Sequence, residues 1–258
     1  MRLSIELVDQ ILSFLQSDPV SLEACQESHP LISKIAERHQ FAHVVLDDFN
    51  LCEFAFESSE FTKIIHGQPH LATYVRSIEM RLGVEKYSPE LSSMLSMMTS
   101  LKEIKLYGLS IFRWEEIPEH FRQAFLDCIH LSSMEDVCIV QLSDFPLSVL
   151  NNIKTLTLCA WPEDEYIPDT TKLDDIVGQT PQLESLSLKN VGSGSLQKVI
   201  AWVPGTLHFL NISGDFAYEW LAPLLDHCSN SLTNLQLDLG SQRACPSFYG
   251  FKLYNLKP

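Results

Sequence analysis

The chain has 258 residues, enough for one large domain or for a small domain joined to a larger one. Its net charge of −15 argues against nucleic acid as a partner, because phosphate binding requires clustered lysine and arginine. No apolar run approaches the roughly 18 residues that span a bilayer, and the first residues lack a secretory-signal pattern. The seven scattered cysteines contain no CxxC pair, as is typical of a reducing compartment. We therefore expect an intracellular protein, cytoplasmic or nuclear, without a membrane partner.

The first forty residues predict three short amphipathic helices. The first lies within residues 5–15 and carries apolar side chains on one face, at Val8, Ile11, Leu12 and Leu15. Asp18 and Pro19 are typical of a helix start, and a third helix is expected over residues 31–41. Three such helices bury little surface by themselves, so they need a partner protein or the domain that follows.

The residue order of this segment resembles an F-box, most closely that of fungal F-box proteins. The resemblance rests on Leu3-Ser4-Ile5-Glu6-Leu7, Ile11-Leu12 with Leu15, Asp18-Pro19 with Leu22 and Ala24-Cys25, and the ending His39-Gln40-Phe41 before Ala42-His43-Val44-Val45-Leu46. It implies that residues 1–45 dock a Skp-type adaptor protein, which connects to a cullin and a RING ubiquitin ligase. The residues that it assigns to this docking are Leu3, Ile5, Leu7, Val8, Ile11, Leu12, Leu15, Leu22, Cys25 and Ile32.

Two positions depart from the F-box pattern. Ser4 stands where the motif has proline, and Ile32 falls where the third helix usually has tryptophan. Tryptophan is a residue type that often anchors an interface. A helical bundle that merely caps the following domain is therefore the alternative interpretation of residues 1–45.

A second pattern recurs beyond residue 70: an apolar residue, two of any kind, an apolar residue, one of any kind and an apolar residue. Its copies are VRSIEM (75–80), LKEIKL (101–106), MEDVCI (134–139), IKTLTL (153–158), LESLSL (183–188), LHFLNI (207–212) and LTNLQL (232–237). The last two apolar positions alternate with other residues, as in a strand that buries one face. Helix-like stretches lie between the copies, at 88–98, 118–129, 171–179, 196–203 and through Leu221, Leu224 and Leu225.

The copies follow one another at intervals of 19 to 33 residues, against roughly 20 to 29 residues for leucine-rich repeats. They resemble the irregular, ribonuclease-inhibitor-like leucine-rich repeats that follow the F-box in those fungal proteins. The expected fold is α/β: a three-helix F-box followed by a solenoid over 71–258 with a parallel concave sheet. The aromatic tail at 242–258 would either close the solenoid or mark a chain that ends early relative to its relatives. The segment 46–70 is expected to connect box and solenoid through helix, with Phe54, Phe56, Phe61 and Ile64 packed inward.

Residues between the apolar strand positions would lie on the concave face of such a solenoid. The candidate contacts to a target protein are Lys105, Lys154, Ser187, Asn211 and Gln236. For any single one of these side chains solvation is the favoured interpretation, and recognition is expected only of the surface as a whole.

Motifs for catalysis, cofactors or metal binding are absent from the sequence. There is no GxSxG, P-loop or GxGxxG motif. His39 and His43 are four residues apart, as are His66 and His70, but no HExxH or Cys/His quartet accompanies either pair. We expect no catalytic residue, no cofactor and no metal.

The leading functional hypothesis is a substrate-recruiting subunit of a Skp–cullin–F-box ubiquitin ligase, with an unidentified protein as its target. One alternative is a leucine-rich-repeat interaction scaffold whose degenerate F-box has no ligase role. A hydrolase or transferase on an α/β fold is a third possibility, and it would require the nucleophile or cofactor motif that the sequence lacks.

Overall fold

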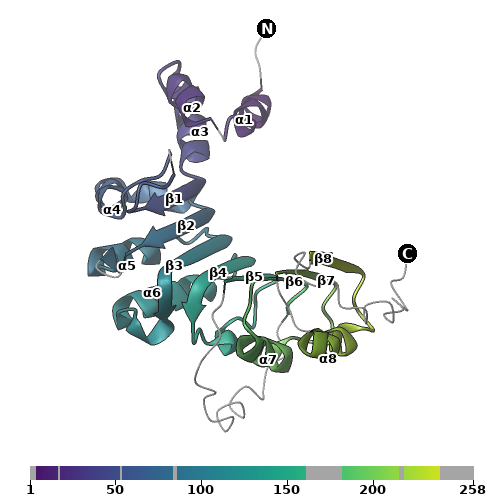
Figure 1. Cartoon of the computed structure of the whole chain (residues 1–258). Helices are drawn as coiled ribbons and strands as arrows, with labels where there is room; N and C mark the ends of the chain where they lie inside the picture. Colours follow the sequence, from purple (N-terminus) through teal and green to yellow (C-terminus); the bar gives the residue numbers. More distant parts are fainter. Residues whose placement is uncertain are drawn as a thin grey trace. The chain divides into compact units, whose positions relative to one another are not determined.

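The computed structural model describes residues 4–16, 18–52, 54–83, 86–160, 182–214 and 218–238 (Figure 1). Its strands follow the order of the chain, from β1 to β8, and each pair whose register is defined is parallel. The predicted α/β class with a parallel sheet is therefore confirmed, while the F-box and the leucine-rich repeats stay predictions. The chain divides into two compact units, Met1–Ile104 with Ile117–Ser133, and Lys105–Glu116 with Met134–Pro258.

Unit 1 begins with the helices α1 (Ile5–Ser13), α2 (Pro19–Gln26) and α3 (Pro30–Gln40). Each is capped by a side chain that accepts a backbone N–H: Ser4 from Leu7, Asp18 from Ser21, and His29 from Leu31. Proline occupies the first position of α2 and α3, where no helical hydrogen bond is lost. The three predicted helices are thus present, and caps encoded in the sequence define their starts.

These helices have a small apolar core of their own. It consists of Leu12, Leu22, Ile35 and Ala36, and Val8, Leu15, Cys25 and Ile32 pack against it partly buried. The core draws on all three helices, so it holds them together as a module. We call residues 4–40 the helical module.

The remainder of unit 1 packs helices against parallel strands. Its elements are β1 (His43–Asp47), α4 (Ser58–Gly67), the 3-10 helix η1 (Pro69–Tyr74), β2 (Ser77–Leu82), α5 (Pro89–Ser96), the beginning of β3 (Glu103–Arg113) and α6 (Glu119–Ile129). The register pairs Val44 with Ile78 and Leu46 with Met80, all buried. Stacked and tilted rings of Phe41, Phe56 and Phe61 lie beside them.

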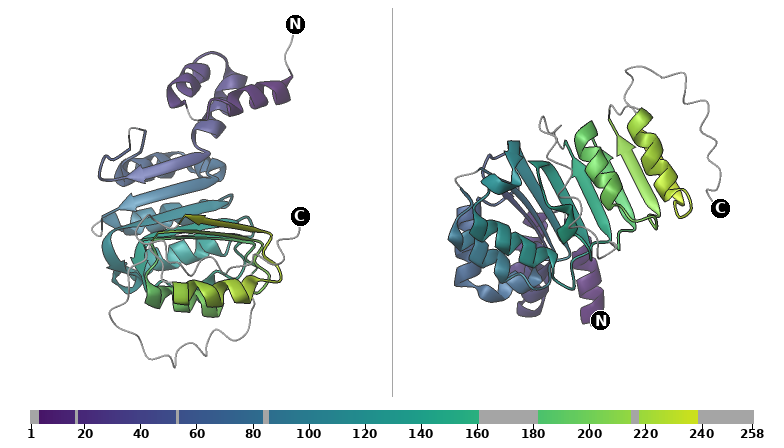
Figure 2. Two further views of the ribbon diagram at one scale, coloured as in Figure 1. Left: turned by 45° about the vertical axis from the view of Figure 1, so that its right-hand side comes forward. Right: turned by 90° about the horizontal axis from the view of Figure 1, so that it is seen from below.

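Unit 2 consists of strands that repeat one sequence pattern, together with helices. After the remainder of β3 come the short 3-10 helix η3 (Trp114–Glu116), β4 (Asp136–Ser143), η4 (Leu147–Val149), β5 (Thr155–Cys159), β6 (Ser185–Lys189), α7 (Ser193–Trp202), β7 (Phe209–Ser213), α8 (Tyr218–Cys228) and β8 (Asn234–Asp238). In the register, Leu156, Leu186, Leu210 and Leu235 are opposite one another. Figure 2 shows α7 and α8 on one side of these strands.

The seven recurring sequence motifs each coincide with a strand, from β2 to β8. The helices expected near 88–98, 118–129, 196–203 and 221–225 are also present. The expected helix at 171–179 and the tail at 242–258 lie outside the described residues. Among the residues that are described, no helix is both long and apolar enough to cross a membrane.

One expectation for the segment 46–70 was wrong. Phe61 is buried as predicted, but Phe54 is 60% exposed instead of packed inward. The reason is that the segment does not enter its helix until Ser58, so Phe54 belongs to the preceding loop and does not share the inward face of α4.

Candidate functional site

Helix α1 presents two apolar faces, and only one of them is used inside the module. Val8, Leu12 and Leu15 point to the internal core. Leu7, Ile11 and Phe14 have the i, i+4, i+7 spacing of a neighbouring face, and their exposed fractions are 42%, 47% and 81%. We call Leu7, Ile11 and Phe14 the outer stripe. Three large apolar side chains at helical spacing form a contiguous exposed apolar surface, which scattered single residues do not.

Further apolar side chains of the helical module are exposed. Ile5 is the first residue of α1, Val20 is the second residue of α2 and Leu31 is the second residue of α3. Their exposed fractions are 55%, 66% and 59%. The module therefore keeps a closed internal core and still leaves apolar surface on each of its three helices.

The residues that the sequence assigned to adaptor docking divide into four groups. Ile5, Leu7 and Ile11 are exposed, while Val8, Leu15, Cys25 and Ile32 are partly buried against the core. Leu12 and Leu22 lie inside the module, only 3% and 1% exposed, and their side chains offer a partner almost no surface in this conformation. Leu3 lies outside the described residues.

Sequence reasoning missed three exposed residues, Phe14, Val20 and Leu31. The signal for Phe14 was available, because Leu7, Ile11 and Phe14 form a second apolar series displaced by one residue from Val8, Leu12 and Leu15. A periodic pattern alone does not decide which of two adjoining apolar faces turns inward. Packing against α2 and α3 decides it here.

A polar cluster fastens α1 to α3. The Asp9 carboxylate pairs with the Arg38 guanidinium and lies 2.7 Å from Nε2 of His39. The other ring nitrogen, Nδ1, lies 2.8 Å from Nε2 of Gln16. In the neutral tautomer that carries its proton on Nε2, His39 donates to Asp9 and accepts from Gln16, so both of its ring nitrogens are satisfied. The cluster sets the position of α1, and with it the direction of the outer stripe.

The electrostatics of this cluster are visible at Asp9. Burial pushes the pKa of Asp9 upward, but the hydrogen bonds from His39 and Arg38 and the positive charge of Arg38 outweigh this effect, so the pKa lies below its ordinary value. The ionised carboxylate is therefore the form that holds α1 to α3.

The structure brings together some of the candidate target-binding residues of unit 2. Ser187 on β6 is opposite Asn211 on β7, which is opposite Gln236 on β8. Lys154 instead precedes β5, and its Nζ lies 3.7 Å from a Glu135 carboxylate oxygen. The residue of β5 that is opposite Ser187 is Thr157. Lys105 lies half-buried on β3 between the buried Ile104 and Leu106.

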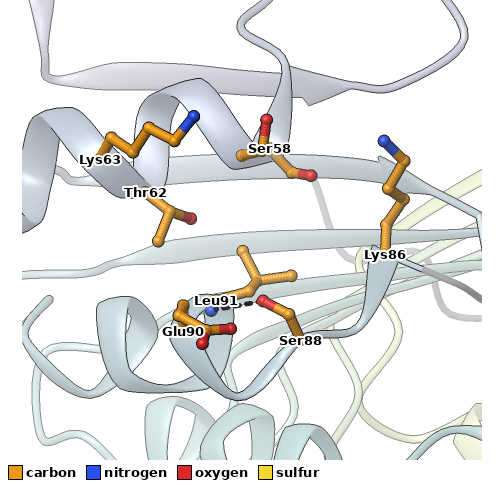
Figure 3. Close-up of a pocket in the computed structure, with 8 residues that line it drawn as sticks. Ser58, Thr62, Lys63, Lys86, Ser88, Glu90 and Leu91 are labelled. Atoms are coloured by element: carbon orange, nitrogen blue, oxygen red, sulfur yellow. Dashed lines mark hydrogen bonds between the residues drawn. The ribbon is translucent and has the colours of Figure 1, made fainter.

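A cavity of about 230 Å³ lies between α4 and the start of α5 in unit 1 (Figure 3). Its walls are Ser58, Ser59, Thr62 and Lys63 on one side and Lys86, Ser88, Glu90 and Leu91 on the other. Lys86 Nζ lies 3.4 Å from a carboxylate oxygen of Glu57, and Ser88 Oγ accepts the backbone N–H of Leu91. Ser58 donates to the Asp48 carboxylate. Two lysines are thus balanced by Glu57 and Glu90, which gives an ionic ligand little net charge to bind.

The histidine pairs noted in the sequence do not combine into a ligand set in the described part of the chain, where no three or more His, Cys, Asp and Glu side chains could hold a metal ion. His39 is engaged by Asp9 and Gln16. His70 Nε2 lies 3.7 Å from a Glu37 carboxylate oxygen. The expectations of no metal, no cofactor and no catalytic residue stay predictions.

No family model, no curated protein and no solved structure matches this chain.

Proposed function

We propose that this protein is a substrate-recruiting adaptor of a Skp–cullin–F-box ubiquitin ligase, with the helical module docking a Skp-type adaptor. The observation that carries the proposal is the outer stripe: Leu7, Ile11 and Phe14 are exposed although the module has a complete apolar core without them. The F-box resemblance of residues 3–41 supplies the identity of the partner, and the stripe supplies a surface for it.

The physical case for docking is the cost of leaving these side chains in water. Burying apolar surface contributes roughly 25 cal/mol per Å². An amphipathic helix realises this gain by laying its apolar face into a groove of the partner. The helical module can do so without unfolding, because Leu12, Leu22, Ile35 and Ala36 remain packed inside it. The stripe can thus be buried with little rearrangement of the module.

In this role the protein performs no bond chemistry itself. It holds a target protein near a ligase whose other subunits transfer ubiquitin, and raising the local concentration of the target is the contribution to the rate. Unit 2 would bind the target, and the helical module would bind the adaptor. The candidate target contacts that share one row, Ser187, Asn211 and Gln236, support this division.

The test is the affinity of the full chain for a purified Skp-type adaptor, measured by titration calorimetry. Leu7→Asp and Ile11→Asp each place a charge in the outer stripe, and each is expected to weaken binding at least about 30-fold, the loss of about 2 kcal/mol typical of an interface hot spot. Gln10→Asp adds the same charge at an exposed polar position of the same helix and is expected to bind like the parent chain. Binding that is absent, or that is equally strong in all four proteins, would remove the proposal.

A second candidate function is an interaction scaffold without a ligase role. Two observations favour it: Ile32, which occupies the tryptophan position of the motif, packs against the internal core of the module, and Ser4 serves as a helix cap where the motif has proline. The same titration separates the two functions. A scaffold binds its protein partners through unit 2 and gives no heat with the Skp-type adaptor.

A further inference from the structure

The cavity between α4 and the start of α5 has charges of both signs on facing walls (Figure 3). Lys63 lies on α4 in one wall, and Glu90 lies in the first turn of α5 in the other. Lys86 already has a partner, since its Nζ lies 3.4 Å from a carboxylate oxygen of Glu57. Among the residues that the structure describes, neither Lys63 nor Glu90 is within ion-pair distance of an opposite charge. An ammonium and a carboxylate thus line one cavity without neutralising each other.

Both groups carry their charge at neutral pH. The Glu90 carboxylate accepts hydrogen bonds from its own backbone N–H and from Ser88, and these hold its pKa below the ordinary value. Lysine loses its charge near neutral pH only when it is buried, and the Lys63 side chain is exposed. The cavity therefore offers one positive and one negative charge to a bound molecule.

The cavity also has a buried hydroxyl and an apolar wall. Thr62 and Leu91 line it and are 7% and 1% exposed. Thr62 Oγ1 donates to Met94 Sδ over 3.7 Å, so the hydroxyl oxygen keeps its lone pairs for a donor group of a ligand. Figure 3 shows this hydroxyl pointing into the space between the two walls, with the Leu91 side chain below it. The walls thus suit a molecule that has both an N–H donor and an apolar part.

The volume of the cavity limits the size of that molecule. It is about 230 Å³, and a water molecule takes up about 30 Å³ of the liquid, so the space matches about eight waters or about eight non-hydrogen atoms. Drug-sized ligands occupy roughly 300–1,000 Å³. A ligand with a single charge would also leave the opposite charge of the cavity desolvated and unpaired, which is costly. A small molecule with one positive and one negative group avoids this cost.

We propose that this cavity binds a free α-amino acid with a short, uncharged side chain. The carboxylate of the amino acid pairs with Lys63, and its ammonium group pairs with Glu90 and donates to Thr62. Its side chain packs on Leu91. The proposal goes beyond the proposed function, because the cavity belongs to α4 and α5 and the outer stripe belongs to α1.

The test titrates the full chain with each of the common free L-amino acids by calorimetry. Those with short, uncharged side chains are expected to bind, and those with charged or large aromatic side chains are not. The amino acid that binds most tightly is then compared with two analogues, the amine that lacks its carboxylate and the acid that lacks its amino group. Each analogue loses one charge pair and is expected to bind at least about tenfold more weakly.

Matched variants locate the binding. Lys63→Met and Glu90→Gln each remove one charge at an exposed position, where folding is little affected, and each is expected to weaken binding at least about tenfold. Lys34→Met makes the same change at an exposed position of α3 and is expected to bind like the parent chain. Failure of every amino acid to bind, an analogue that binds as tightly as the amino acid, or equal binding by all four proteins would each overturn the proposal. The adaptor titration decides the proposed function independently, since its variants lie in α1.

Discussion

Asp47 ends strand β1 with its side chain buried, only 2% exposed. Its carboxylate accepts the backbone N–H groups of Phe49 and Leu51, at 2.9 and 2.8 Å. These bonds shape the loop that leads to α4, in which Asn50 adopts a left-handed conformation with φ of 56°. The loop is thus built around one acidic side chain that accepts two of its backbone N–H groups.

We predict that Asp47→Ala lowers the free energy of unfolding by about 2–3 kcal/mol, because it leaves two backbone donors of the loop without their acceptor. The measurement is urea denaturation of the full chain. Asp226→Ala removes an exposed carboxylate on α8 and is expected to change stability by less than about 0.5 kcal/mol. Equal effects of the two substitutions would contradict the structural role of Asp47.

The Asp9 carboxyl group is expected to make the stability of the folded protein depend on pH. Burial raises the pKa of Asp9, but His39 and Arg38 lower it by more than burial raises it. The folded pKa therefore lies below the unfolded value of about 3.9. A carboxyl group with a depressed folded pKa stabilises the protein fully above its unfolded pKa, and this contribution disappears as the pH falls through the folded pKa. The stabilisation by Asp9 is therefore expected to be lost below about pH 4.

The check is the stability of the parent chain and of Asp9→Asn between about pH 5 and about pH 2. Acidification should lower the unfolding free energy of the parent chain more than that of the variant, since the variant has no carboxyl group to protonate. Parallel curves for the two proteins would show that the Asp9 carboxylate does not hold α1 to α3. Solvent screens the pair, because the Asp9 side chain is 40% exposed.

At the scale of elements, substitutions in helix α1 can test whether one of its apolar faces is buried and the other exposed. Ile11 and Leu12 are adjacent, yet Ile11 is 47% exposed and Leu12 is 3% exposed. We predict that Leu12→Ala lowers the unfolding free energy by about 2–5 kcal/mol, through lost burial and the cavity left behind. Ile11→Ala is expected to cost less than about 1 kcal/mol.

Urea denaturation followed by helical circular dichroism measures both variants. Since alanine favours a helix at either position, propensity does not explain a difference between them. If the two costs were reversed, Ile11 would be the internal residue, and the outer stripe would not be available to a partner.

The strands of unit 2 could be predicted from the sequence because each carries its own marker. An apolar pair separated by one residue, such as Leu186 and Leu188 or Leu210 and Ile212, buries one face of every strand, and the register aligns these pairs between neighbours. The sequence pattern did not show that Lys154 lies outside its strand, although we expected it on the concave face. The residue between the apolar pair of β5 is Thr157, and Lys154 lies before the strand begins.

Helix starts were equally predictable where a side chain caps them, as Ser4, Asp18 and Ser88 do. The exposure of Phe54 was not predictable in this way. Helix α4 begins at Ser58 without a side-chain cap on Glu57, so the sequence carried no cap to separate the helix from the loop before it. Which face of α1 is internal also depended on α2 and α3, and no local pattern contains that information.

At the scale of the whole molecule, the expected boundaries at residues 45 and 70 both fall inside unit 1, and Lys105–Glu116 groups with residues that follow Ser133. Contacts between residues far apart in the sequence define such units. A motif repeated at similar intervals along the chain does not predict where one unit ends and the next begins. In the proposed function, the helical module would bind the adaptor and unit 2 would bind the target.

The most direct test of this account is hydrogen–deuterium exchange of the full chain with and without a purified Skp-type adaptor. The account predicts slower amide exchange in α1 and at the starts of α2 and α3, where the exposed apolar side chains lie, with β4 to β8 unchanged. Exchange in α1 that stays the same under saturating adaptor, or protection confined to unit 2, would contradict it.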